Sequence, residues 1–377
     1  KHLSPMLPQS PGRRVSRAPA EGHPQLARSP CGRTVRLSRQ AGSPQTRGFT
    51  LIELLVACAV LSLILVIIFM IISQTSSLWK STTSKIAAFQ NARAAFEAVT
   101  RNLSQATLNH YLDYYDKDWN HTTTSPTNAL PAHYGRYSEL ELVSGPASEL
   151  FPSPDGKVSH AVFFQAPLGK TDSTDLTMES PGMLNAVGYF VGFGPRSRYE
   201  QVPIFLLGEA GADRVGFRLI EWVQPAENLA IYDKSYLGGQ PWRWFQDPVG
   251  DGLSCRVMAE NVVALIILPK RDAANAPPLA ATYSYDSLTT GYVDDRSHLL
   301  PPLLQVTLVA IDEVSAQRLR SIHGDSQPPI IPAGAFQSIG TYDKDLQDLE
   351  DVLNGKNGGP RLNYRIFTTT VSTKENK

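Results

Sequence analysis

Glu53 is an acidic side chain inside an almost unbroken apolar segment, where it needs a partner. It is the only charged residue between Phe49 and Ile72. A carboxylate at such a position costs about 2 to 3 kcal/mol on insertion scales unless it is paired or reaches the headgroups. The chemistry that Glu53 offers is ion pairing, because a carboxylate in an apolar environment is stabilised by a cationic partner.

The element that positions Glu53 is predicted to be a long helix. From Phe49 to Ile72 there are about 24 residues, enough at about 1.5 Å rise per residue to cross a hydrocarbon core of roughly 30 Å. No Pro or Gly interrupts the chain between Phe49 and Tyr111. Further apolar residues recur at three- and four-residue spacing, at Ile86, Phe89, Ala92, Phe96, Val99, Leu103 and Ala106. We therefore expect a transmembrane helix over 49–72 that continues as an amphipathic helix over 73–110 and docks through Phe89 and Phe96 on its own globular head.

A specific string opens the apolar run: Arg47-Gly48-Phe49-Thr50-Leu51-Ile52-Glu53. Together with the following helix, it resembles the class III signal of type IV pilins and type II secretion pseudopilins. The resemblance implies cleavage after Gly48 by a prepilin peptidase, N-methylation of Phe49 as the mature N-terminus, and an assembly role for Glu53 at the fifth mature position. It also implies that helix 49–72 forms a filament core with other pilin-like subunits. The alternative is a plain signal anchor whose glutamate lies near the headgroups by chance.

Charge is distributed unevenly along the chain, although 35 basic and 35 acidic residues cancel. Residues 1–48 hold nine Lys and Arg and one acid, which leaves 26 basic and 34 acidic residues in the remainder. A basic segment before an apolar helix stays in the cytoplasm under the positive-inside rule. We expect 1–48 to be a disordered leader that the peptidase removes, and the protein to be a single-pass inner-membrane protein with a periplasmic head over 111–377. The acidic remainder offers no footprint for nucleic acid, and we expect no such partner.

The head is predicted to be α+β, with an antiparallel sheet packed on the long helix. After a loop over 110–133, the hydrophobic period changes from 3.6 to 2. One late helix is expected over 343–353, acidic in its first turns. The segment over 214–219 alternates and should have one solvated face, whereas 262–268 is continuously apolar and should be covered on both faces. The expected strands are 137–143, 161–165, 186–193, 214–223, 262–268, 303–311 and 364–371.

No common catalytic template is present in the head, so we expect no enzyme and no cofactor. The sequence contains no Gly-x-Ser-x-Gly, Walker A, His-Glu-x-x-His or Cys-x-x-Cys motif. The acidic residues over 343–351 lack the glycine of an EF-hand loop and read as a solvated helix rather than a calcium site. Asp312 and Glu313 read as a strand end and turn rather than an acid/base couple, because neighbouring strand residues point to opposite faces. The aromatic run around Trp242 and Trp244 is either a partner surface or a loop anchored on the sheet.

Three further strings resemble the prepilin-type proteins called Verru_Chthon cassette protein C. They are 256–265, 300–313 and 363–371. The large head also looks like that of the bulky minor pseudopilins.

We expect a minor pilin or pseudopilin, a structural subunit whose helix packs with others into a filament. The alternative is a membrane-anchored binding module or exported enzyme that uses the signal only for delivery. A polar cleft with converging titratable side chains would favour the alternative, and a sheet with an apolar helix seam would favour the structural subunit.

Overall fold

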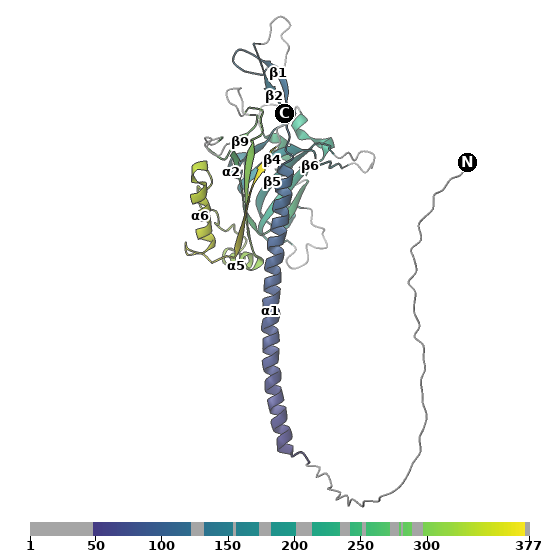
Figure 1. Ribbon diagram of the computed structural model, residues 1–377, viewed down its shortest axis with the longest axis vertical. Coiled ribbons are helices and arrows are strands. Elements are labelled where there is room, and N and C mark those ends of the chain that lie inside the picture. Colours follow the sequence, from purple (N-terminus) through teal and green to yellow (C-terminus); the bar gives the residue numbers. More distant parts are fainter. Residues whose placement is uncertain are drawn as a thin grey trace, which may run out of the picture. The chain divides into compact units, whose positions relative to one another are not determined.

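In the computed structural model the chain forms two units, 1–66 and 67–377. The described residues are 48–121, 132–153, 156–172, 182–200, 213–233, 242–250, 254–271, 279, 282–288 and 297–373, without the side chains of 80 and 81. The predicted leader therefore lies outside the described residues except for Gly48. Figure 1 shows the elements by their labels.

Helix α1 spans Leu51–Leu103. The prediction that the helix continues to residue 110 is wrong, since the helix ends at Leu103. The chain leaves the helix through a turn in which the Gln105 and Ala106 amides donate to carbonyls only three residues back. Thr107 N then donates to the carbonyl of Gln165 on the sheet. The backbone groups after Leu103 thus find partners outside a helix, as buried backbone groups must.

Eleven strands are described, and all of their pairings are antiparallel. A six-stranded sheet has the order β7-β6-β5-β4-β3-β9, a three-stranded sheet the order β11-β10-β8, and β1 and β2 form a hairpin. The strand bounds are β1 Tyr111–Tyr115, β2 His133–Tyr137, β3 Val143–Pro146, β4 Lys157–Ala166, β5 Asn185–Gly194, β6 Gly216–Gln224, β7 Cys255–Glu260, β8 Val262–Lys270, β9 Tyr285–Asp286, β10 Leu303–Ile311 and β11 Tyr364–Ser372. The α+β class with an antiparallel sheet is confirmed.

Four shorter helices accompany the sheets: α2 Ala147–Leu150, α4 Arg243–Gly250, α5 Glu313–His323 and α6 Tyr342–Leu353. Short 3₁₀ turns lie at Arg196–Arg198, Ala226–Asn228, Ala230–Tyr232 and Ile339–Thr341. Helix α6 confirms the predicted late helix, but its acids are not all solvated. Asp345 is buried and accepts hydrogen bonds from Phe336 N and Thr341 Oγ1.

Strand β8 is buried on both faces, as its continuous apolar run predicts. It packs against β4, whose β-bulge between Val158 and Ala161 presents two side chains to the β8 backbone. Ser159 Oγ accepts from Leu265 N at 3.0 Å, and His160 Nδ1 accepts from Ile267 N at 3.2 Å. Burial lowers the pKa of His160 to about 4, so this ring is neutral and can accept. The bulge therefore satisfies amides that an edge strand would otherwise leave unpaired.

Three sequence expectations for the head are wrong. Strand 137–143 is interrupted, since β2 ends at Tyr137 and β3 begins at Val143. Strand β6 has no solvated face, because Arg218 and Glu221 are buried with polar partners. The strand ends before Asp312 as expected, but the expected turn is instead the start of α5, where the Asp312 carboxylate accepts from Ser315 N and caps the helix.

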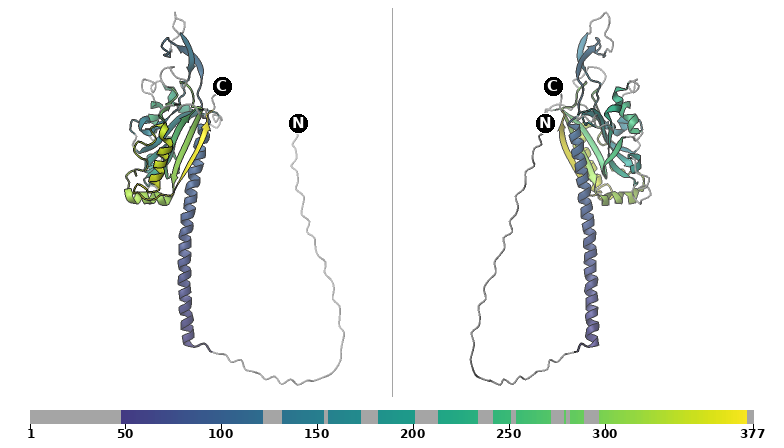
Figure 2. Two further views of the ribbon diagram at one scale, coloured as in Figure 1. Left: turned by 60° about the vertical axis from the view of Figure 1, so that its left-hand side comes forward. Right: turned by 90° about the vertical axis from the view of Figure 1, so that its right-hand side faces the viewer.

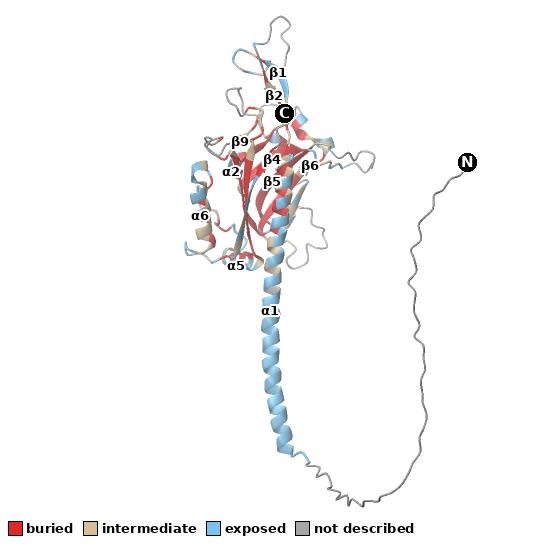
Figure 3. Ribbon diagram, in the orientation of Figure 1, coloured by how far each residue is buried: buried red, intermediate tan, exposed pale blue. Residues whose placement is uncertain are grey.

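The C-terminal part of α1 docks on the sheets, as its apolar stripe predicts. Ala92, Phe96, Val99 and Leu103 are buried, whereas the burial expected for Ile86 is wrong, since it is 52% exposed. The Phe96 ring lies 5.9 Å from the ring of Phe367 on β11. Figure 2 shows β11, coloured yellow, beside this part of the helix, and Figure 3 shows the buried sheets in red. These contacts form an apolar seam between helix and sheet.

A polar chain reinforces the seam. Asn102 Nδ2 donates to Tyr189 Oη at 2.6 Å, and Tyr189 Oη donates to the buried carboxylate of Glu221 at 2.9 Å. Arg256 Nε on β7 completes the chain with a hydrogen bond to Glu221 at 2.5 Å. Helix α1 is therefore tied through β5 and β6 to β7. Such satisfied buried networks fix one arrangement of the elements they join.

Truncating Phe96 tests the seam. We expect Phe96→Ala to destabilise the head by about 3 kcal/mol, since it removes a buried aromatic ring and leaves a cavity. Urea unfolding of the full chain in detergent measures this loss. Ile86→Ala, at an exposed position of the same helix, should change stability by less than about 0.5 kcal/mol. Equal losses for the two variants would contradict docking through this face.

Candidate processing and assembly site

The bond between Gly48 and Phe49 lies in an exposed, non-helical segment just before α1. The Phe49 side chain is 89% exposed. A Cβ built on Gly48 would meet no atom within 4 Å. This conformation leaves the backbone on both sides of the bond open to an external enzyme, and no fold contact in the described chain depends on the absence of a side chain at Gly48.

Thr50 and Glu53 form a reciprocal cap at the start of α1. Glu53 Oε2 accepts from Thr50 N and from Thr50 Oγ1, both at 2.9 Å, and Thr50 Oγ1 accepts from Glu53 N at 3.4 Å. This is the capping box, in which a Thr and a Glu three residues apart satisfy amides that have no partner within the helix. This role of Thr50 was not predicted, although the Thr-x-x-Glu spacing is its signal.

The cap gives Glu53 a second possible role besides ion pairing. It positions the carboxylate at the first turn of α1, where a negative charge also interacts favourably with the helix dipole. Phe49 directly precedes Thr50, so cleavage after Gly48 would create an amine one residue before the cap. The carboxylate can then serve either the backbone of its own helix or a nearby amine, and these two uses can be separated by mutation.

The apolar part of α1 that follows Glu53 is exposed along its whole length. The residues from Leu51 to Ile72 are all exposed in the structure, which contains no membrane and no partner. Among the described residues, α1 is long and apolar enough to cross a membrane. An apolar surface of this extent needs lipid or other helices to cover it.

The first part of the sequence shows a family likeness. Residues 44–69 match the prokaryotic N-terminal methylation motif. The matched region includes Gly48, Phe49 and Glu53 and extends over most of the apolar segment. No curated protein and no solved structure matches the chain.

The motif is a prepilin-type signal, and its presence indicates a type IV pilin-like exported subunit. It implies processing by a prepilin peptidase and assembly with other pilins in general. Together with the apolar helix, it indicates membrane anchoring. The roles of Gly48, Phe49 and Glu53 individually stay predictions.

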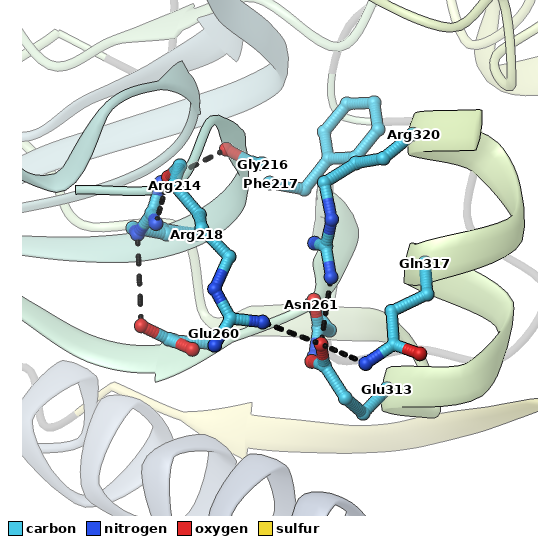
Figure 4. Close-up of a pocket in the computed structure, with 9 residues that line it drawn as sticks. All are labelled: Arg214, Gly216, Phe217, Arg218, Glu260, Asn261, Glu313, Gln317 and Arg320. Carbon is cyan, nitrogen blue, oxygen red and sulfur yellow. Dashed lines mark hydrogen bonds and ion pairs between the residues drawn. The ribbon is translucent and has the colours of Figure 1, made fainter. Parts of the chain in front are cut away.

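The head contains a polar cavity of about 300 Å³, which Figure 4 shows. Glu313 lies at its centre and accepts hydrogen bonds from Asn261 Nδ2 at 2.9 Å and Arg320 Nη2 at 2.6 Å. Arg214 Nη1 lies 3.6 Å from the same carboxylate. Burial alone would raise the pKa of Glu313, but the hydrogen bonds from Asn261 and Arg320 and the charge of Arg320 together lower it.

A third arginine of this cavity, Arg218, is held by backbone carbonyl groups. Arg218 is buried, and its guanidinium donates to the carbonyl oxygens of Gly194, Gly216 and Arg214. Glu260 lies 3.9 Å from Arg218 Nε. The charged groups of the cavity thus contact one another and join β6, the β7–β8 connection and α5. We assign this cluster a structural role.

Removing Glu313 tests this assignment. We expect Glu313→Ala to lower the free energy of unfolding by about 2 kcal/mol, because it leaves Arg320 and Asn261 without their acceptor. Glu97→Ala is the matched control, since Glu97 pairs with Arg93 on the exposed face of α1 and should cost less than about 0.5 kcal/mol. Urea unfolding of the full chain measures both values, and a neutral Glu313→Ala would contradict the structural role.

The tryptophans of the aromatic run are anchored, not presented to solvent. Trp244 is buried and Trp242 is partly buried against the core. Part of the predicted loop around them, over 234–241, lies outside the described residues. The run was expected to be either a partner surface or a loop anchored on the sheet. For these two side chains, the structure supports the anchored loop.

The described residues contain no group of three or more His, Cys, Asp or Glu side chains that could hold a metal ion. The acids over 343–351 are therefore not gathered around one point in this structure. Asp345 instead serves the fold, through the hydrogen bonds to Phe336 N and Thr341 Oγ1 described above.

Proposed function

We propose that this chain is a minor pilin-like or pseudopilin subunit with a structural rather than a catalytic role. Its precursor is cleaved after Gly48, Phe49 becomes the N-methylated terminus, and the apolar part of α1 packs with the helices of other pilin-like subunits. Before assembly the protein is anchored in the inner membrane, with the leader in the cytoplasm and the head in the periplasm. The observation that carries this proposal is the methylation motif over 44–69, placed directly on an apolar helix whose side chains are exposed.

The architecture of the head supports a structural subunit. The antiparallel sheets carry an apolar seam with α1 through Phe96 and Phe367, and a hydrogen-bonded chain through Asn102, Tyr189 and Glu221. A helix fixed in this way can transmit the position of a filament core to the head. The resemblance of 256–265, 300–313 and 363–371 to Verru_Chthon cassette protein C favours an accessory subunit of a multi-pilin cassette.

Mass spectrometry of the protein purified from its native membrane tests the proposal. We expect a chain that begins at Phe49 and carries one methyl group on its amine, together with co-purifying pilin-like proteins. A chain that retains residues upstream of 49 would reject processing. A correctly processed chain that never co-purifies with another pilin-like protein would instead favour a membrane-anchored binding module delivered by the same signal.

A further inference from the structure

Helix α4 is attached to the edge of the six-stranded sheet by two indole hydrogen bonds. Trp244 Nε1 donates to Glu141 Oε2 at 2.6 Å, and Trp242 Nε1 donates to Asp286 Oδ2 at 3.1 Å. Glu141 lies two residues before β3, and Asp286 belongs to β9, the edge strand that pairs with β3. The two carboxyl groups therefore accept hydrogen bonds from Trp244 of α4 and from Trp242, the residue before α4, at the edge of the sheet.

The two carboxyl groups also lie close to each other. Glu141 is only 4% exposed, and Asp286 is near enough to act on its ionisation. Two adjacent carboxylates repel each other, so a proton on one of them stabilises the pair. Burial first, and the negative charge of Asp286 second, raise the pKa of Glu141 well above its usual range.

Glu141 also has an uncharged partner on a neighbouring strand. On β4, Gln165 Oε1 accepts from Glu141 N and carries no charge. The charged groups on the surrounding elements have other contacts: Arg243 with Asp247 on α4, Glu149 of α2 with Ser284, Glu139 with Asn109 and Tyr111, and Lys157 of β4 with the Phe151 ring. The negative charge of Asp286 disfavours ionisation of Glu141.

The elements joined by this cluster are among the shorter ones of the head. Strand β9 has two residues and pairs with β3 at two positions. Helix α4 has eight residues and contains Pro248, which cannot donate a backbone hydrogen bond. Elements with so few backbone hydrogen bonds open locally at low free energy unless side chains hold them.

We propose that Glu141, Asp286, Trp242 and Trp244 form a proton-operated clasp, which holds α4 and β9 on β3 while Glu141 is protonated and releases them when Glu141 ionises. The clasp is independent of the proposed assembly function, since it lies wholly within the head. It makes the surface formed by α4 responsive to the pH of the compartment that the head occupies.

The sign of the effect follows from linkage. Glu141 holds a proton in the closed state at pH values where it has lost that proton in the open state, so raising the pH favours opening. Between the usual pKa of a glutamate and the raised pKa of Glu141, the ratio of open to closed molecules should increase up to tenfold per pH unit. Below this range the ratio is constant at its lowest value, and above it the ratio is constant at its highest value.

Amide hydrogen exchange of the full chain in detergent tests the clasp. Exchange in 242–250 and 282–288 is followed from pH 5 to 9 and corrected for the intrinsic rate of unstructured peptide. We expect the opening constant of both segments to rise steeply with pH, while that of β10 and β11 stays constant. A flat profile in the two segments of the wild-type chain would overturn the proposal.

Two variants that nearly preserve the side-chain shape distinguish the effect of protonation from the effect of packing. Glu141→Gln keeps an acceptor for Trp244 and a donor for Asp286 but cannot ionise, so its profile should be flat and closed. Asp286→Asn removes the like charge, and the total rise in opening should become smaller. A wild-type pH dependence that survives in Glu141→Gln would overturn the clasp. If the segments of Glu141→Gln are instead open at every pH, the proposal is tested by Asp286→Asn alone. An increase of the opening constant with pH that is the same in Asp286→Asn as in the wild type would then overturn the clasp.

Discussion

Replacing Gly48 with valine is expected to leave the precursor uncut, with the leader still attached and the Phe49 amine still part of a peptide bond. A Cβ at this position would meet nothing in the described chain, so the substitution leaves the fold of the protein intact. The loss then arises at the peptidase, where a β-branched side chain must be accommodated next to the scissile bond. We expect the mature fraction to fall by roughly tenfold or more, a size that steric discrimination by an enzyme pocket commonly reaches.

The control for this experiment is Gly42→Val, a change of the same kind upstream of the motif match over 44–69. This variant should be processed normally. Intact mass measurement of membrane fractions distinguishes precursor from mature chain in both variants. Normal mature protein from Gly48→Val would remove the processing site from the proposal, while the methylation motif itself would still need an explanation.

Three strands could be predicted because their local sequence strongly favours a strand. Strands β8, β10 and β11 begin and end within two residues of the predicted bounds. Strands β8 and β10 are runs of apolar and β-branched residues, which favour a covered, pleated position, and β11 contains three consecutive threonines, which favour a strand even where they are exposed. The apolar stripe of α1 was predicted for the same reason, since Ala92, Phe96, Val99 and Leu103 repeat at helical spacing and all are buried.

The burial of β6 could not be predicted, because it depends on distant partners. Arg218 alternates with apolar residues over 214–219 and so indicates a solvated face. In the fold, Arg218 donates to backbone carbonyls, and Glu221 contacts Lys170 and Arg256 from other parts of the chain. Once paired in this way, charged side chains can be buried. A sequence pattern records residue polarity but not such partners.

Helix α5 was missed for a different reason, since its signal was present. Asp312 is a strong N-cap residue, and the apolar residues Ala316 and Leu319 follow it three residues apart, which is a helical spacing. The strand over 303–311 ends directly before it, and this led to the interpretation of Asp312 and Glu313 as a turn. Thr50 at the start of α1 was overlooked in the same way. Capping residues next to a strongly apolar segment are easily read as part of that segment or of a loop.

Replacing Glu53 with alanine should separate membrane insertion from assembly. Insertion should be as efficient as in the wild type or better, because removal of the charge saves about 2 to 3 kcal/mol on insertion scales. Assembly should fail, because the amine of a processed neighbour would be buried without a counter-ion, and breaking a buried pair costs about 3 to 5 kcal/mol. Such a loss corresponds to a decrease of more than about a hundredfold in the association constant. Fractionation of membranes and of sheared filaments measures the two properties separately.

The capping box makes a second variant necessary. Thr50→Ala removes two of the hydrogen bonds at the helix start, including the Oγ1 contact with Glu53 Oε2, but leaves the carboxylate in place. If Glu53 acts chiefly as a counter-ion, Thr50→Ala should cost only the roughly 1 kcal/mol of a lost cap and should assemble nearly normally. If Glu53 acts chiefly as a cap, Thr50→Ala and Glu53→Ala should impair assembly to a similar degree. The ion-pairing role is therefore supported only by a large difference between the two variants, since both weaken the first turn of α1 but only one removes the charge.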